Sequence, residues 1–130
     1  NTSRNLFKEM PKLSTQKGLD HFESAQLLQR HQRYRDAVSR AYYAIYTEVV
    51  NWVGGGEWNH RSIRSEFARK IHEKGIPGQQ ARHLNNRFLR ALEARIAADY
   101  NLDEVTTEIV EETFEIAQTI FTFLEEEGTP

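Results

Sequence analysis

The chain has 130 residues, 38% of them hydrophobic and 28% charged, which suits one domain with a single hydrophobic core. It contains no cysteine, which excludes disulfides and thiolate metal sites. No run approaches the roughly 18 apolar residues of a membrane-spanning helix, and no basic segment followed by an apolar one opens the chain. We therefore expect a cytoplasmic protein without a membrane partner.

Charge is distributed unevenly along the chain. Residues 1–100 hold all 17 Lys and Arg, 12 of them Arg, against ten Asp and Glu, a net charge of +7. Residues 101–130 hold nine acidic residues and no Lys or Arg. Either the acidic C-terminal segment neutralises its neighbours within the fold, or the arginine-rich remainder binds phosphate, which suits the planar guanidinium group.

The N-terminal residues 1–13 are predicted to form a lead-in that Pro11 interrupts. Three of its apolar residues are candidates to pack against the body: Leu6, Phe7 and Met10. A first helix is expected after Ser14 or Thr15, either of which is a good N-cap, and should run to about His31. Its hydrophobic face is expected to comprise Leu19, Phe22, Ala25, Leu27 and Leu28.

A second helix is predicted from Tyr34 to about Trp52, because apolar residues recur there at steps of three and four. The expected stripe is Tyr34, Ala37, Val38, Ala41, Tyr42, Ile45, Val49 and Trp52. Three consecutive glycines at 54–56 have too much backbone freedom to continue it. Asn59 can cap a third, shorter helix, on which Ile63, Phe67 and Ile71 share one face.

Two further helices follow the Gly-Ile-Pro-Gly break at 75–78. The first, about 79–98, is expected to bury Ala81, Leu84, Phe88, Ala91, Leu92 and Ile96. The second should open at Asp103 and Glu104, since acidic residues favour the positive end of a helix dipole. Its apolar stripe is Val105, Ile109, Ile116, Ile120, Phe123 and Leu124, widened by Val110, Phe114 and Phe121.

No segment alternates with a period of two for long enough to form a strand. The predicted fold is all-α, an antiparallel up-down four-helix bundle with one additional short helix, spanning residues 14–127.

Arg95 is the most informative single residue. It follows Ala91 by four positions and Leu92 by three, so it projects from the core-facing side of its helix. A buried guanidinium costs several kcal/mol unless it is paired, and Asp99, one turn on, is the natural partner. The pair is either a structural ion pair or the wall of a cleft in which Arg95 binds a phosphate.

Two segments together resemble a known family. Residues 34–53 read YRDAVSRAYYAIYTEVVNWV, and they are followed by His60, Phe67 and the run Arg95 to Tyr100, RIAADY. This pattern resembles the HEPN family (higher eukaryote and prokaryote nucleotide-binding domains), in its small prokaryotic branch, over roughly residues 17–125. The resemblance implies a helical domain that dimerises. In HEPN ribonucleases the corresponding arginine opens an R-x4–6-H motif, whose Arg and His act on RNA without metal in a cleft at the dimer interface.

That motif is incomplete here, because Tyr100, Asn101 and Leu102 stand where the histidine should. A tyrosine with a pKa near 10 is a poor general acid–base at neutral pH. In HEPN proteins that pair with a minimal nucleotidyltransferase (MNT) antitoxin, a tyrosine near the motif can receive adenylyl groups. Tyr100 loosely resembles such an acceptor; otherwise it packs at the helix end.

His60 lies outside the motif, beside Arg61 and Arg64. It could supply the missing proton donor from another element, or it could cap a helix or bind a loop carbonyl. His72 and His83 are too unspecific to indicate a metal site, and we expect no metal or cofactor.

On the second helix, Asp36 and Arg40 can pair, with Tyr43 near the same side and Tyr46 between this face and the buried stripe. This polar and aromatic face is either solvated or the surface of a homodimer, because interfaces are enriched in aromatic residues and Arg.

Our leading hypothesis is a dimeric HEPN-like domain that binds RNA or a nucleotide phosphate through Arg40, Arg95, Asp99 and Tyr43. It would be one component of a prokaryotic toxin–antitoxin or stress-defence pair with an MNT-type nucleotidyltransferase. The enzymatic alternative is a metal-independent ribonuclease that uses Arg95 with His60 or Tyr100. The third alternative is a structural dimerisation scaffold.

Overall fold

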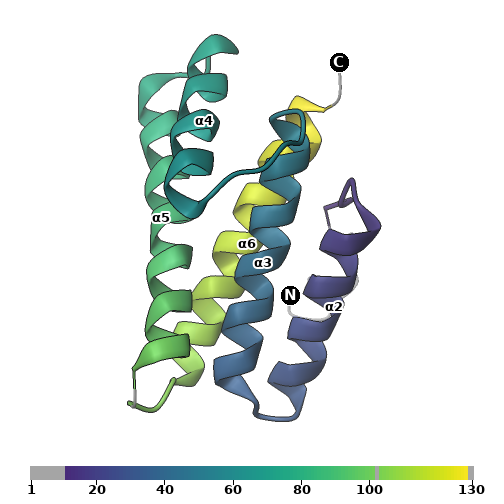
Figure 1. Cartoon of the computed structure of the whole chain (residues 1–130), viewed down its shortest axis with the longest axis vertical. Coiled ribbons are helices and arrows are strands. Elements are labelled where there is room, and N and C mark those ends of the chain that lie inside the picture. The colour runs from purple at the N-terminus through teal and green to yellow at the C-terminus, as the bar shows by residue number, and fades with distance from the viewer. Residues whose placement is uncertain (1–10, 102, 129–130) are drawn as a thin grey trace, which may run out of the picture.

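The computed structural model describes residues 11–101 and 103–128, and these contain five α-helices and no strand (Figure 1). The helices are α2 (Gln16–Arg30), α3 (Tyr34–Trp52), α4 (His60–Glu73), α5 (Gly78–Tyr100) and α6 (Thr107–Glu127). The all-α prediction is thereby confirmed for the described residues. None of these helices combines the length and apolarity that crossing a membrane requires. The prediction for Leu6, Phe7 and Met10 lies outside the described residues.

The helix ends follow the capping signals of the sequence. The Thr15 side chain accepts a hydrogen bond from the Gly18 amide at the start of α2. Asn59 and Ser62 form a reciprocal capping box at the start of α4. The three glycines after α3 all have positive φ values, between 82° and 107°, which residues with a Cβ rarely adopt.

The last helix begins later than predicted. It starts at Thr107, and the Thr106 side chain caps it by accepting from the Ile109 amide. Asp103 lies before the helix, because the Arg35 guanidinium on α3 donates to the carbonyls of Asn101 (2.8 Å) and Asp103 (2.7 Å) and thus holds the loop outside it. The prediction that Asp103 and Glu104 open this helix was therefore wrong.

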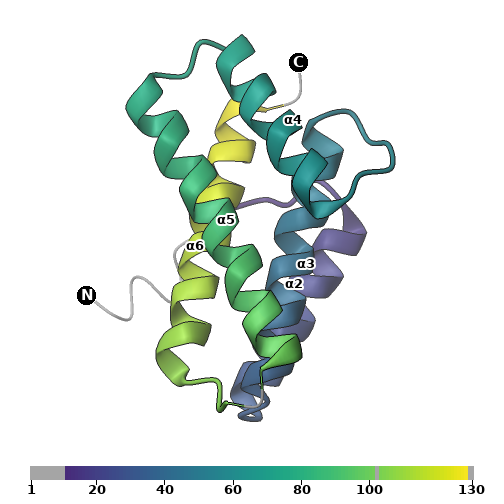
Figure 2. The same ribbon diagram turned by 60° about the vertical axis from the view of Figure 1, so that its left-hand side comes forward.

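Helix α3 contacts each of the other described helices. α2 lies along one side of it, while α5 and α6 lie on the other side and contact each other (Figures 1 and 2). The shorter α4 lies beside the first half of α5. Two rings of α6, Phe114 and Phe121, contact Phe22 of α2 at 5.5 and 5.3 Å between centroids, so aromatic contacts also join α2 to α6.

Most predicted core residues are buried or half-buried, but three are exposed. Leu19, Leu27 and Ile96 are 36%, 50% and 45% exposed. On α2 the buried line is Gly18, Phe22 and Ala25, so the two leucines fall beside the contact with α3. On α5 the buried residues include Ala94 and Ala98, and Ile96 lies midway between them, on the opposite side of the helix.

Glu48 of α3 is a buried carboxylate, a position that the sequence alone did not predict. It is 4% exposed and accepts hydrogen bonds from the Ser14 amide (2.6 Å), the Thr15 amide (3.1 Å) and the Thr15 hydroxyl. Gly18 leaves room for it, because a Cβ there would lie 2.3 Å from a Glu48 oxygen. This contact joins the N-terminus of α2 to α3, at the end of the helix dipole that favours negative charge.

Candidate functional site

The Arg95 guanidinium is the centre of a buried polar cluster that three helices supply. The residue is 7% exposed. Its Nη2 lies 2.9 Å from Nε2 of His60, at the start of α4, and 3.2 Å from the Tyr43 hydroxyl on α3. Its Nη1 lies 3.3 Å from a carboxylate oxygen of Asp99, one turn further along α5. The structure therefore brings together Arg95, His60, Tyr43 and Asp99 from the predicted site residues.

Aromatic rings surround the guanidinium. Its Cζ atom lies 5.6 Å from the centre of the Tyr42 ring and 5.4 Å from that of Tyr43, within the range of cation–π attraction. Adjacent tyrosines on one helix can both reach Arg95 because it lies between the two faces to which they point. The Nε atom of Arg95 is buried and has no hydrogen-bond partner among the described residues. One donor of the guanidinium is thus left unused.

The contacts of His60 define its protonation state. A guanidinium nitrogen can only donate, so Nε2 of His60 must accept from Arg95. A neutral imidazole then carries its proton on Nδ1, which donates to the Tyr42 hydroxyl oxygen 2.7 Å away. Burial, and then the positive charge of Arg95, lower the pKa of His60 below its ordinary value. His60 is therefore neutral at physiological pH, with its lone pair directed at Arg95.

Two members of this neighbourhood were missed as site residues. Tyr42 was predicted only as a core residue, yet its hydroxyl orients His60, and burial raises the pKa of that hydroxyl. Tyr46 had been placed at the edge of the stripe; its ring lies 5.3 Å from the His60 ring and its hydroxyl donates to the Trp58 carbonyl. The spacing of 42, 43 and 46 on one helix was the available signal, since residues three and four apart share a face.

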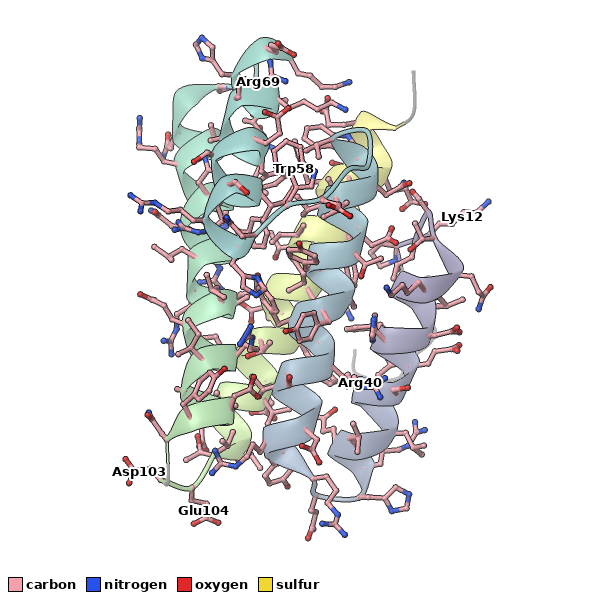
Figure 3. The ribbon with its side chains drawn as sticks, viewed as in Figure 1. Lys12, Arg40, Trp58, Arg69, Asp103 and Glu104 are labelled. Atoms are coloured by element: carbon pink, nitrogen blue, oxygen red, sulfur yellow. The ribbon has the colours of Figure 1, made fainter. Side chains whose placement is uncertain are left out.

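Two predicted site residues lie apart from the cluster. Arg40 is exposed, and Figure 3 shows it between α3 and α2. Its charge acts on His21, whose pKa is lowered first by burial and then by Arg40. Tyr100 is 73% exposed, and its hydroxyl makes no hydrogen bond within the described part of the chain. The expected ion pair between Asp36 and Arg40 is likewise not formed among the described residues.

Acidic residues of the C-terminal helix α6 neutralise part of the positive charge of α5. Arg87 of α5 pairs with Glu115 of α6 at 3.2 Å, and Arg90 pairs with Glu112 at 2.9 Å. Arg61 and Arg64 of α4 form no ion pair with any described acidic residue, and Arg64 contributes to the electrostatic environment of Tyr42. Positive charge therefore remains on the α4 side of the cluster.

The fold and the site together define the class of this protein. It is a helical domain in which histidine and tyrosine side chains hold a buried arginine. The HEPN domain model matches residues 12–127, which is most of the chain. The chain belongs to the HEPN family, and this membership points to a role connected with nucleotides or RNA. No curated protein and no solved structure matches the chain.

Proposed function

We propose that this HEPN domain binds RNA or a nucleotide phosphate at Arg95. The observation that carries the proposal is that Arg95 is buried but held mainly by neutral groups, His60 and Tyr43. Asp99, the one carboxylate among the described residues that pairs with Arg95, lies at 3.3 Å with a side chain 30% exposed, so it compensates the charge only in part. An arriving anion would improve the pairing of this guanidinium.

Phosphate binding would exchange one hydrogen-bond partner of Arg95 for another. A phosphate oxygen takes the place of Nε2 of His60 as acceptor, and a second oxygen can use another N–H of the same fork. His60 is then free to bind a proton at Nε2 and to donate it to the phosphate. Tyr43 keeps the guanidinium in position from the α3 side, and the free cations of α4 add attraction at longer range.

The wider assembly belongs to the same proposal. We take α2, α3, α5 and α6 as an antiparallel up-down four-helix bundle, with α4 as the additional short helix, in a domain over residues 14–127. The domain would act in the cytoplasm as a homodimer and as one component of a toxin–antitoxin or stress-defence pair with an MNT-type nucleotidyltransferase. Family membership supports this, and the exposure of Tyr100 leaves its hydroxyl accessible to an adenylyl donor.

One observation favours a second candidate, a metal-independent ribonuclease. The histidine that is missing from the R-x4–6-H spacing is replaced in space by His60, 2.9 Å from Arg95. Nε2 of His60 would remove the proton of a ribose 2′-hydroxyl as its oxygen attacks the adjacent phosphorus. The bond to the 5′-oxygen breaks, that oxygen takes a proton from water, and Arg95 stabilises the charge on the phosphorus oxygens. The Tyr100 hydroxyl makes no hydrogen bond to the cluster among the described residues, so this candidate uses His60.

The test compares two arginines of α5. Labelled single-stranded RNA is titrated at low salt with the wild type, with Arg95→Gln and with Arg90→Gln, a control on the same helix. We expect Arg95→Gln to lose at least about tenfold in affinity, since a charge-assisted hydrogen bond contributes about 1.5–3 kcal/mol. Arg90→Gln should change affinity less than about twofold.

Circular dichroism must show that both variants fold. Unchanged RNA affinity in a folded Arg95→Gln variant would overturn the phosphate site. Cleavage of RNA in the presence of a chelator, abolished by His60→Gln, would favour the ribonuclease over the binding module.

A further inference from the structure

A surface hollow lies next to the Arg95 cluster. Its volume is about 360 Å³, and it lies between the start of α2, the second half of α3 and the loop that joins α3 to α4. The lining residues that matter here are Lys17 of α2, Tyr46 and Val50 of α3, and Gly56, Glu57 and Trp58 of the loop. Figure 3 shows Trp58 beside this loop.

The Trp58 ring is held in place by its own loop. Its indole Nε1 donates to the Gly55 carbonyl at 2.8 Å, and its carbonyl accepts from the Tyr46 hydroxyl. Gly56 has φ of 105°, and a Cβ there would lie 3.2 Å from the indole nitrogen. With one hydrogen bond from the loop, one from Tyr46 of α3 and space left at a glycine, Trp58 presents a preorganised aromatic wall, which lowers the entropic cost of binding a flat ligand.

Tyr46 belongs both to this hollow and to the surroundings of Arg95. Its ring lies 5.3 Å from the His60 ring and 6.3 Å from the Tyr43 ring. Both of those residues contact the Arg95 guanidinium directly. The Tyr46 ring, and then the His60 and Tyr43 side chains, therefore lie between the hollow and the Arg95 guanidinium, so the hollow adjoins the proposed phosphate site.

We infer that this hollow binds a nucleobase of the single-stranded RNA or nucleotide whose phosphate lies on Arg95. The inference deepens the proposed function and rests on it. Aromatic side chains bind bases through their π-faces, whatever the sequence. Lys17 and Glu57 offer a donor and an acceptor to the base edge, and their charges cancel, so the hollow favours a neutral ring over a second phosphate.

The experiment separates the base from the phosphate. Adenosine 5′-monophosphate and ribose 5-phosphate are titrated into the full chain, and each affinity is measured by NMR. We expect the wild type to bind the nucleotide about tenfold more tightly, which is the usual size of one stacking interaction. In Trp58→Leu the two ligands should bind within about twofold of each other, with ribose 5-phosphate unaffected.

Phe114→Leu is the matched control, since Phe114 lies on α6 and faces Phe22. It should keep the tenfold preference. If Trp58→Leu does not fold, the wild type alone still tests the base site. The indole N–H resonance of Trp58 should shift when adenosine 5′-monophosphate is added and should not shift when ribose 5-phosphate is added.

Equal affinity of the wild type for both ligands would overturn the base site and leave the phosphate site standing. Binding of neither ligand, at any concentration tested, would overturn both.

Discussion

Nε2 of His60 lies 2.9 Å from a guanidinium nitrogen of Arg95, although 35 residues separate them and they belong to different helices. The contact gives this chain an arginine–histidine pair that its linear motif lacks. Because Arg95 can only donate, the pair also fixes His60 as a neutral acceptor. Both consequences can be measured.

Phosphate binding at Arg95 should be coupled to proton uptake at His60. While Nε2 accepts from Arg95, the ring must stay neutral; a bound phosphate removes that donor and brings negative charge, so the pKa of His60 rises on binding. The affinity for RNA should therefore increase as pH falls below about 7, by at most about tenfold per pH unit. Binding isotherms between about pH 5.5 and 8 measure it. The same pH slope in His60→Gln would exclude this histidine as the source.

The stability of the fold should also depend on pH, through the imidazole rings of His60 and His21. Burial is the first cause that lowers the pKa values of both His21 and His60 below the ordinary 6.5. The unfolded chain then binds more protons than the folded one as pH falls below about 6.5, so the free energy of unfolding decreases in that direction. It should be constant above that value, as far as these two residues contribute. Urea unfolding at several pH values should give a shallower decrease for His21→Gln combined with His60→Gln.

Gly18→Ala should destabilise the protein even though alanine favours helices by about 1 kcal/mol over glycine. The new Cβ would lie 2.3 Å from a Glu48 oxygen and 2.8 Å from the Thr15 hydroxyl, so it displaces the buried carboxylate from the amides that it binds. We expect a net loss of about 1–3 kcal/mol in urea unfolding. Gly78→Ala is the control, because its nearest neighbour is the flexible end of Arg82 at 3.4 Å. Equal effects of the two substitutions would contradict the role of Glu48.

Arg35→Ala should loosen the connection between α5 and α6. The Arg35 guanidinium donates to the carbonyl of Ala98, which satisfies an acceptor that the end of α5 leaves open, and to the carbonyls of Asn101 and Asp103 in the connection that follows. Its loss should cost about 1.5–3 kcal/mol of stability. Arg33→Ala removes an exposed arginine whose side chain makes no hydrogen bond to a described residue, and it should cost less than about 0.5 kcal/mol. The rate of amide hydrogen exchange at the end of α5 should increase in Arg35→Ala and not in Arg33→Ala.

The sequence predicted the helices well because their signals are local. Apolar spacing marked α3, and Thr15 and Asn59 marked helix starts by side-chain chemistry that acts within three residues. The sequence-based prediction failed where a residue that is distant in the chain determines the local structure. Arg35 delays the start of α6, and the position of α3 against α2 leaves Leu27 in solvent.

The candidate site, like the fold, was predictable only where local spacing along one helix determines it. Helical spacing placed Arg95 inward and Asp99 beside it, as the structure has them. The same spacing cannot say which residue of another helix meets the guanidinium, so the pairing with His60 was one alternative among several. Tyr42 looked apolar in the stripe because a buried ring gives no sign of where its hydroxyl points. The role of these residues in binding stays a prediction.

The most direct test of the central claim is to observe Arg95 and His60 by NMR while single-stranded RNA is added to the folded protein. We expect the Arg95 side-chain N–H resonances and the His60 ring resonances to move together, at the same RNA concentration. RNA that binds while both sets of resonances stay unchanged, and only exposed arginines such as Arg40 respond, would contradict it.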